Sequence, residues 1–269
     1  MNIHTIILAG GKGTRMLSQK AKVLQALGGT TMLNHVMTAA NKISNKISVV
    51  VGFDKEGVEE EIKKIGINAN TFLQKEQIGT ADAVKTTLKD IDKNEKILIL
   101  YGDVPLINEE TLKKLCNQES DLSILTTNLE NPTGYGRTLK DKENNVLGII
   151  EEKDADSEQK KIKEIFTGIL VAKGSVLKKY IPEINNNNAT KEFYLTDLIG
   201  IAHKNGFKIN TLSSSNEETA GANNRIEQEE LEKTLRIMKS DDLLRDGVTL
   251  LDKSRVDVRG EVKTGSDCV

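Results

Sequence analysis

The sequence predicts an α/β fold, in which a mixed and mostly parallel sheet is flanked by helices. Short apolar runs rich in Ile, Leu and Val recur through the first hundred residues, and such runs are typical of strands buried on both faces. Segments with helical spacing lie between them, and strands that alternate with helices form parallel βαβ units. Beyond residue 121 the apolar segments follow one another after short turns, which indicates an antiparallel addition to the same sheet.

Each expected element has its own pattern. The parallel part is expected to contain strands over residues 3–8, 47–51, 71–73 and 97–100 and helices over residues 32–43, 58–65 and 80–91. The later part is expected to contain strands over residues 122–127, 136–139, 146–151, 165–172 and 207–212, with a helix over residues 193–204. Glu, Lys, Leu and Arg dominate residues 224–244, which predicts one long C-terminal helix that ends near Gly247. Val and Gly recur over residues 256–265, a pattern similar to the start of a β-solenoid coil.

Composition and charge narrow the class of partner. Charged residues make up 29% of the 269 residues, but the formal net charge is only −2, and Lys forms no basic block. This balance gives no reason to expect nucleic acid or an anionic membrane as a partner. No apolar run is long enough to span a bilayer, and the two cysteines are too far apart in the sequence to form a metal-binding motif. We therefore expect a globular protein of the cytoplasm.

A glycine-rich segment, Gly10-Gly11-Lys12-Gly13-Thr14-Arg15, follows the first expected strand. Glycines let the backbone approach phosphate oxygens, and successive N–H groups form a nest for anions. The spacing does not match a dinucleotide fingerprint or a Walker A loop, because Met16 stands where the first needs glycine and the Gly-Lys-Ser/Thr of the second is absent. A bare Gly-Gly-x-Gly could be a simple turn, but the added Thr14-Arg15 favours a phosphate-binding loop.

The segment from Leu8 to Met16 resembles the signature of the sugar nucleotidyltransferase superfamily. Within it, the chain resembles the uridylyltransferase half of the bacterial bifunctional N-acetylglucosamine-1-phosphate uridylyltransferase/glucosamine-1-phosphate acetyltransferase family, over nearly its whole length. Further motifs of that family follow in the same order: Lys22-Val23-Leu24, Gln74 with Gln77-Ile78-Gly79-Thr80, Leu100 to Leu106, Pro132 to Arg137, Glu151 with Lys153-Asp154, Thr167 to Leu170, Tyr194 to Asp197, and Asn223-Asn224-Arg225.

The resemblance implies a Rossmann-like nucleotide-diphospho-sugar transferase fold. It divides the chain into a nucleotidyltransferase domain over residues 1–225, a linker helix over residues 226–247 and the start of a truncated left-handed β-helix over residues 248–269. It also implies the reaction of UTP with N-acetylglucosamine 1-phosphate, with Mg²⁺ as cofactor, to give pyrophosphate and UDP-N-acetylglucosamine for peptidoglycan and lipopolysaccharide synthesis. Acetyl transfer is not expected, and homo-oligomers are expected only if the missing β-helix domain is present.

Site residues are also implied by the resemblance. Arg15 and Lys22 are expected to neutralise phosphate charge in catalysis, and Asp103 and Asn223 to hold Mg²⁺. The positions implied to contact the substrates are Leu8, Ala9, Gly10, Gly11, Lys22, Gln74, Gly79, Thr80, Tyr101, Gly102, Asp103, Gly136, Glu151, Phe166 and Asn223.

Some of these positions have a chemical reason of their own, and some have a structural alternative. Asp103 ends the strongest central strand, and ligands of open α/β sheets gather at the carboxyl ends of strands. Gln74 is expected to be a buried amide that offers both a donor and an acceptor to a pyrimidine. Asn223 could equally be the N-cap of the long helix that follows it.

Phe166 departs from the family pattern, which has Asn-Thr-Gly where this chain has Phe166-Thr167-Gly168. A phenyl ring cannot replace the hydrogen bonds of an amide, although it can pack on the face of a sugar. Two alternative hypotheses therefore stay open: transfer to another sugar 1-phosphate or from another nucleotide, and a non-catalytic nucleotide-binding homologue.

Overall fold

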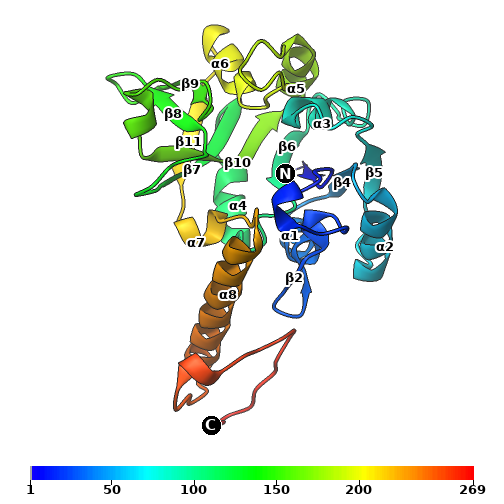
Figure 1. The fold of residues 1–269 in the computed structure, drawn as a ribbon, viewed down its shortest axis with the longest axis vertical. Helices are drawn as coiled ribbons and strands as arrows, with labels where there is room; N and C mark the ends of the chain where they lie inside the picture. Colours follow the sequence, from blue (N-terminus) through cyan, green and yellow to red (C-terminus); the bar gives the residue numbers. More distant parts are fainter. Residues whose placement is uncertain (1) are drawn as a thin grey trace.

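The computed structural model describes residues 2–269, and a nine-stranded mixed sheet forms its centre (Figure 1). Seven strands follow the order β11-β7-β10-β6-β1-β4-β5, and the β8/β9 ladder branches from β10. The strands of this sheet are β1 (Ile3–Leu8), β4 (Lys46–Val51), β5 (Asn70–Leu73), β6 (Lys96–Tyr101), β7 (Leu122–Asn128), β8 (Arg137–Lys140), β9 (Val146–Ile150), β10 (Glu164–Lys173) and β11 (Ile209–Ser213).

Strand directions confirm the mixed, mostly parallel sheet. β1 pairs in parallel with both β4 and β6, and β5 pairs in parallel with β4. Among the seven strands of the main order, β10 is the antiparallel one, because it lies between β6 and β7 and runs against both. The β8/β9 ladder is antiparallel as well. The parallel strands begin at one edge of the sheet, so the loops that follow β1, β5 and β6 all leave from the opposite edge.

Helices cover both faces of the sheet, because the central strands are apolar on both sides. On one face, Ile3 and Ile7 of β1 pack with the buried residues of α1 (Met32–Asn41), α2 (Lys55–Ile65) and α4 (Glu109–Cys116). On the other face, Ile6 and Leu8 pack with α3 (Thr80–Lys85), α5 (Gly174–Tyr180) and α6 (Asp197–Lys204).

The long helix α8 (Arg225–Arg245) extends away from the sheet (Figure 1). Its buried residues Leu231 and Leu235 pack with Leu27 of a small hairpin, β2 (Ala26–Leu27) and β3 (Thr30–Thr31), in a third apolar cluster. The helix ends as predicted, since Gly247 follows it with φ +90° and donates its N–H to the carbonyl of Leu244.

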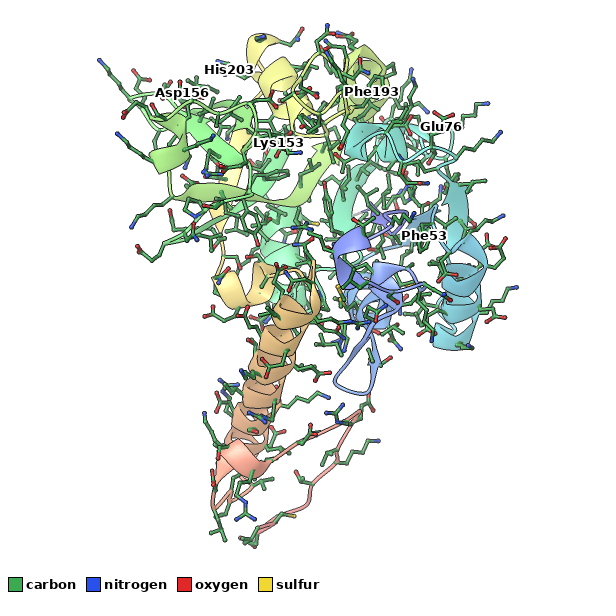
Figure 2. The ribbon with its side chains drawn as sticks, viewed as in Figure 1. Phe53, Glu76, Lys153, Asp156, Phe193 and His203 are labelled. Carbon is green, nitrogen blue, oxygen red and sulfur yellow. The ribbon has the colours of Figure 1, made fainter. Side chains whose placement is uncertain are left out.

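Two helices are shorter than the sequence predicts. The expected helix over residues 80–91 is regular only as far as Lys85, because the hydroxyls of Thr86 and Thr87 donate to the carbonyls three residues earlier and tighten the chain into turns. The expected helix over residues 193–204 begins at Asp197. The backbone of Phe193 is instead bonded to residues 78 and 81 at the start of α3, where Figure 2 labels its side chain.

The C-terminal segment is not a strand. Residues 248–269 contain one short 3₁₀ helix, Lys253–Arg255, and return toward the β2/β3 hairpin, where the N–H of Gly260 donates to the carbonyl of Gly28. The β-solenoid coil therefore stays a prediction, as does the division of the chain at residues 225 and 247. α4, α5, the β2/β3 hairpin and the short helix α7 (Asn216–Thr219) were not expected. No helix within residues 2–269 is long and apolar enough to cross a membrane.

Candidate active site

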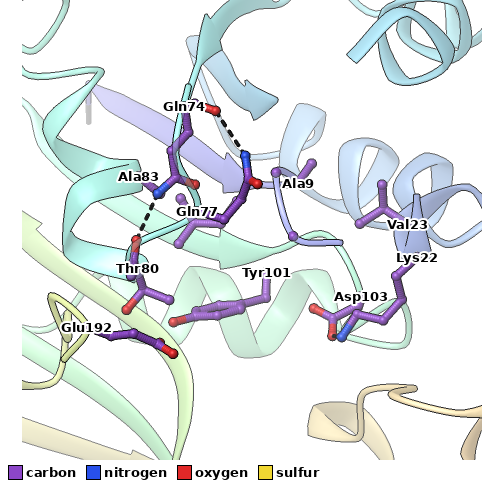
Figure 3. Close-up of a pocket in the computed structure, with 14 residues that line it drawn as sticks. Ala9, Lys22, Val23, Gln74, Gln77, Thr80, Ala83, Tyr101, Asp103 and Glu192 are labelled. Atoms are coloured by element: carbon purple, nitrogen blue, oxygen red, sulfur yellow. Dashed lines mark hydrogen bonds and ion pairs between the residues drawn. The ribbon is translucent and has the colours of Figure 1, made fainter. Parts of the chain in front are cut away.

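Two adjoining cavities open at the carboxyl edge of the parallel strands. The first compartment, of about 260 Å³, is shown in Figure 3. It is lined by Leu8, Ala9, Gly10, Gly11, Lys22, Val23, Gln74, Gln77, Gly79, Thr80, Ala83, Tyr101, Asp103 and Glu192.

The second compartment, of about 450 Å³, lies beside the first and has Thr80, Tyr101 and Glu192 in common with it. Its other lining residues are Arg15, Gly134, Tyr135, Gly136, Glu151, Phe166, Thr167, Gly168, Tyr194 and Thr196. The predicted residues thus divide between two neighbouring spaces. Gly102 and Asn223 line neither, but Gly102 donates its N–H to the carbonyl of Leu8, and Asn223 contacts Lys22.

The glycine-rich loop passes from β1 into the first compartment. A Cβ on Gly10 would lie only 3.3 Å from Gln74 Oε1 and 3.3 Å from the backbone N of Gly52, so the loop lies tightly against the base of the cavity. Gly13 is left-handed, with φ +58°, and leads into a 3₁₀ turn, Thr14–Met16. Arg15 of this turn is exposed and reaches the second compartment.

Lys22 connects three segments that are far apart in the sequence. Its Nζ forms an ion pair with Asp103, which follows β6, and donates to Asn223 Oδ1 at 3.0 Å, just before α8. Figure 3 shows the Lys22 amine against the Asp103 carboxylate. Both side chains are largely buried, with 16% and 15% of their surface exposed, so solvent screens the pair only in part. A carboxylate and an amide oxygen therefore point at the same cation.

Glu227 in the first turn of α8 sets the orientation of Asn223. Its Oε2 accepts the backbone N–H of Asn223 at 2.7 Å and the side-chain Nδ2 at 3.0 Å. Because the amide nitrogen is held there, Oδ1 is turned toward Lys22. The N-cap of α8 is Asn224, whose side chain accepts from the N–H groups of Ile226 and Glu227. The alternative of Asn223 as the cap is therefore wrong.

Gln74 is buried at the base of the first compartment, with 5% of its surface exposed. Its Nε2 donates to the carbonyl of Gly79 at 3.0 Å and to Asp82 Oδ2 at 2.9 Å, so both of its N–H groups bond within the protein. Only Oε1 remains for a ligand. The expectation that this amide offers both a donor and an acceptor is wrong, because Asp82 and Gly79 use the donors.

Gly79 and Thr80 begin α3 against the segment around Phe193. A Cβ on Gly79, which has φ +136°, would lie 2.3 Å from the carbonyl oxygen of Phe193, so only glycine fits. Thr80 Oγ1 accepts the N–H of Leu195 at 2.9 Å. Tyr101 stands between the two compartments, and burial raises the pKa of its hydroxyl, which therefore stays a neutral donor.

Glu151 is one of two carboxylates that line the second compartment, beside Glu192, and Thr196 Oγ1 donates to Glu151 at 2.8 Å. Burial raises its pKa, and the nearby carboxylates of Asp197, Asp154 and Glu192 raise it further. Phe166 is 5% exposed; it packs in the core on that face of the sheet and contributes to the cavity wall.

Several lining residues were not selected from the sequence. Tyr135, Tyr194 and Thr196 lie inside motifs that carry the family resemblance, so that signal was available. Glu192 borders both compartments but lies in none of those motifs, beside a run of asparagines that is typical of a surface loop. Glu227 acts through Asn223, and no local pattern indicates such a role.

Three relatives, each a bifunctional protein GlmU, align with 99% of this chain. The proteins of Ruthia magnifica, Idiomarina loihiensis and Hydrogenovibrio crunogenus are 42%, 39% and 41% identical to it. The chain spans only 59–60% of their lengths. A crystal structure from Bacillus anthracis, provisionally described as a glucose-1-phosphate thymidylyltransferase in complex with sucrose, has the same fold. Its TM-score is 0.69 at 18% identity, and the match covers 93% of this chain and 98% of that one.

A family model, the MobA-like NTP transferase domain, matches residues 5–156. The match spans the glycine-rich loop, Lys22, Gln74, Asp103 and Glu151, and so includes residues of both compartments. The chain therefore belongs to the MobA-like NTP transferase domain family.

Proposed function

We propose that this chain is a uridylyltransferase that joins UTP and N-acetylglucosamine 1-phosphate to form UDP-N-acetylglucosamine and pyrophosphate. The observation that carries the proposal is the pair of adjoining compartments, with Lys22, Asp103 and Asn223 gathered beside the first. The first compartment has the glycine-rich loop and suits a nucleoside triphosphate. The second has carboxylate and hydroxyl groups that suit a sugar. The identity to the three GlmU proteins supports the choice of substrates.

In this reaction an oxygen of the sugar phosphate attacks the α-phosphorus of UTP. The new P–O bond forms as the bond between the α- and β-phosphates breaks, and pyrophosphate leaves with the electron pair. Transfers of this kind depend mainly on alignment and on neutralisation of charge. The Lys22 ammonium, which lines the first compartment, would stabilise the negative charge at the α-phosphate, and exposed Arg15 would contact a phosphate from the side of the second compartment.

Asp103 and Asn223 would hold the Mg²⁺ ion. Their oxygens already converge on one cation, the Lys22 ammonium, and oxygen ligands are those that Mg²⁺ prefers. No group of three or more His, Cys, Asp or Glu side chains able to hold a metal occurs within residues 2–269. Two protein ligands fit an ion that keeps several waters and binds substrate phosphates. When bound, Mg²⁺ would neutralise charge on the phosphates.

Gln74 supports uracil as the base. Its free group is the acceptor Oε1, because both N–H groups bond to Gly79 and Asp82. Uracil has an N–H donor in its ring where cytosine has a lone pair, so an acceptor held in this position favours uracil.

A second candidate keeps the fold and the nucleotide but changes the sugar. Phe166 favours it, because the ring offers the second compartment an apolar surface and no hydrogen bond. A sugar 1-phosphate with fewer hydroxyls to satisfy would then be the better substrate.

Pyrophosphate release across a panel of sugar 1-phosphates and nucleoside triphosphates, each with Mg²⁺, tests the proposal. We expect turnover with UTP and N-acetylglucosamine 1-phosphate to exceed that with every other pair. Faster release with another sugar would favour the second candidate, and UTP binding without any turnover would indicate a binding protein.

Asp103→Ala is expected to lower kcat by about 100-fold or more, because it removes a metal ligand and leaves Lys22 without its counter-charge. Circular dichroism would verify that the variant is folded. Near-normal turnover in a folded Asp103→Ala protein would refute the metal assignment.

A further inference from the structure

An ion pair between a buried arginine and a partly exposed glutamate lies behind the second compartment. Arg137, the first residue of β8, is 1% exposed, and its Nη2 lies 2.5 Å from Glu152 Oε2. Its Nη1 donates to the backbone carbonyl of Tyr135. The Nε of the same guanidinium has no hydrogen-bond partner within residues 2–269. Burial of a guanidinium is costly, and only close pairing and hydrogen bonding compensate for that cost.

The pair holds one short segment of backbone. Glu152 Oε2 also accepts the N–H of Gly134 at 3.3 Å, so the two side chains together bond to the backbone of Gly134 and Tyr135. On the far side of the turn, the carbonyl of Gly136 accepts the N–H of Phe166 at 2.9 Å. We define this segment, residues 134–136, as the wall turn, because all three of its residues line the second compartment.

The wall turn needs such support. Gly134 has φ +88°, and residues 129–136 belong to no helix or strand, so β8 begins only at Arg137. A cavity wall made of glycines and one tyrosine has little packing of its own to fix its position. Glu151 and Glu152 are adjacent, and the first faces the compartment while the second faces Arg137. One backbone segment therefore positions both Glu151, which lines the cavity, and Glu152, which bonds to the wall turn.

We propose that Arg137 and Glu152 are positioning residues, which hold the wall turn at the distance from Glu151 that the sugar requires. Neither side chain lines the cavity, so neither contacts substrate. The depressed pKa of Glu152, for which its hydrogen bond with Arg137 is the main cause, is consistent with a permanent pair. The kinetic part of this inference rests on the proposed function.

Glu152→Gln tests the proposal, because it removes the charge but keeps an acceptor of similar shape. Glu164→Gln is the matched control. Glu164 pairs with Lys140 at 2.7 Å within the same part of the sheet, it has a similar exposed fraction (21% against 26%), and it does not touch the wall turn. We expect Glu152→Gln to raise the KM for the sugar phosphate about tenfold and to leave the KM for UTP within twofold, since a small misplacement of a binding wall is costly. Glu164→Gln should change neither.

Amide hydrogen exchange of a peptide over residues 131–136 gives a readout that does not depend on turnover. Exchange there should be at least several-fold faster in Glu152→Gln than in the wild type, and unchanged in Glu164→Gln. The double variant Arg137→Met/Glu152→Leu fills the same space with apolar groups, so that no buried charge is left without a partner and the protein should still fold. It should show the same fast exchange and the same rise in KM for the sugar phosphate.

These readouts separate the two proposals. If wild-type protein releases no pyrophosphate but exchange over residues 131–136 rises in the variants, the proposed function fails and the positioning role stands. If exchange is unchanged in folded Glu152→Gln, or if both KM values rise together, the positioning role is overturned.

Discussion

Glu227 provides the sharpest test of how the metal site is built, because it contacts neither substrate nor the proposed metal. Its carboxylate accepts the backbone N–H and the side-chain Nδ2 of Asn223, and also the Nδ2 of Asn224 at 2.6 Å. Glu227→Gln keeps the length and shape of the side chain. It replaces one of the two accepting oxygens with an amide nitrogen, which donates and cannot accept, so one oxygen is left for the three groups. We expect Asn223 Oδ1 to lose its fixed orientation toward Lys22 and Asp103.

The size of the effect follows from these contacts. Hydrogen bonds to a charged group contribute about 1.5–3 kcal/mol each, and a glutamine still accepts through its own carbonyl oxygen. Loss of a partner that orients a metal ligand typically costs about 10–100-fold in metal affinity. Because one accepting oxygen remains, we expect a loss of metal affinity at the lower end of this range. The Mg²⁺ concentration that gives half-maximal turnover should rise about tenfold, which corresponds to about 1.4 kcal/mol of binding free energy.

Mg²⁺ titrations of pyrophosphate release, at saturating UTP and sugar phosphate, measure this quantity. Glu230→Gln is the matched control, since it removes the same charge from an exposed position on the same helix. It should leave the half-maximal Mg²⁺ concentration unchanged. A Glu227→Gln protein whose Mg²⁺ requirement stays within twofold of the wild type would refute the idea that Glu227 orients a metal ligand.

Two further predictions concern the base and the stability of the fold. Gln74→Leu removes the acceptor Oε1 and the bonds to Gly79 and Asp82. The KM for UTP should therefore rise about tenfold or more, while the KM for the sugar phosphate stays constant. The same KM for UTP in the variant and the wild type would contradict the assignment. His4 is fully buried between Ser48, Glu95, Asp90 and Lys46, and burial lowers its pKa from 6.5. The unfolded chain therefore binds the proton first, and the free energy of unfolding should fall as the pH drops below about 6.5. In His4→Gln this fall between pH 7.5 and 5, measured by urea unfolding, should be smaller; an unchanged slope would exclude His4 as its source.

The central sheet could be predicted because its strands carry their signal locally. β1 and β6 are runs of apolar residues, and burial on both faces follows from that composition. The β2/β3 hairpin could not be predicted in this way. Each strand has two residues, and the hairpin is held by contacts from α8, about 200 residues later, where Gln228 donates to Ala26 and Glu232 accepts from Gly28.

The same distinction, between local signals and contacts with distant segments, applies to the residues of the candidate site. Residues proposed to act through their own chemistry, such as Lys22 and Asp103, could be selected from motifs in the sequence. The positioning role of Glu227 and Arg137 could not be predicted, because it depends on what each side chain bonds to in the fold. Glu227 lies outside every motif, and the motif that contains Arg137 does not show its partners. The donors of Gln74 illustrate the point, since only the structure shows that Asp82 uses one of them.

Lys22, Asp103 and Asn223 meet although about 80 and 120 residues separate them along the chain, so the proposed metal site depends on the docking of α8 against the sheet domain. The docking is made beside Lys22 itself. Arg225 donates to Gln25 at 2.8 Å, and Leu235 packs directly over Gly28, where a Cβ would lie 2.3 Å from it. A chain that ended at the predicted boundary of residue 225 would keep Asn223 and Arg225 but lose Glu227, which orients Asn223. It would also lose the contacts that α8 makes with the β2/β3 hairpin. On this reasoning α8 is part of the proposed active site, and anything that shifts this helix also shifts the oxygen that Asn223 would offer to the metal.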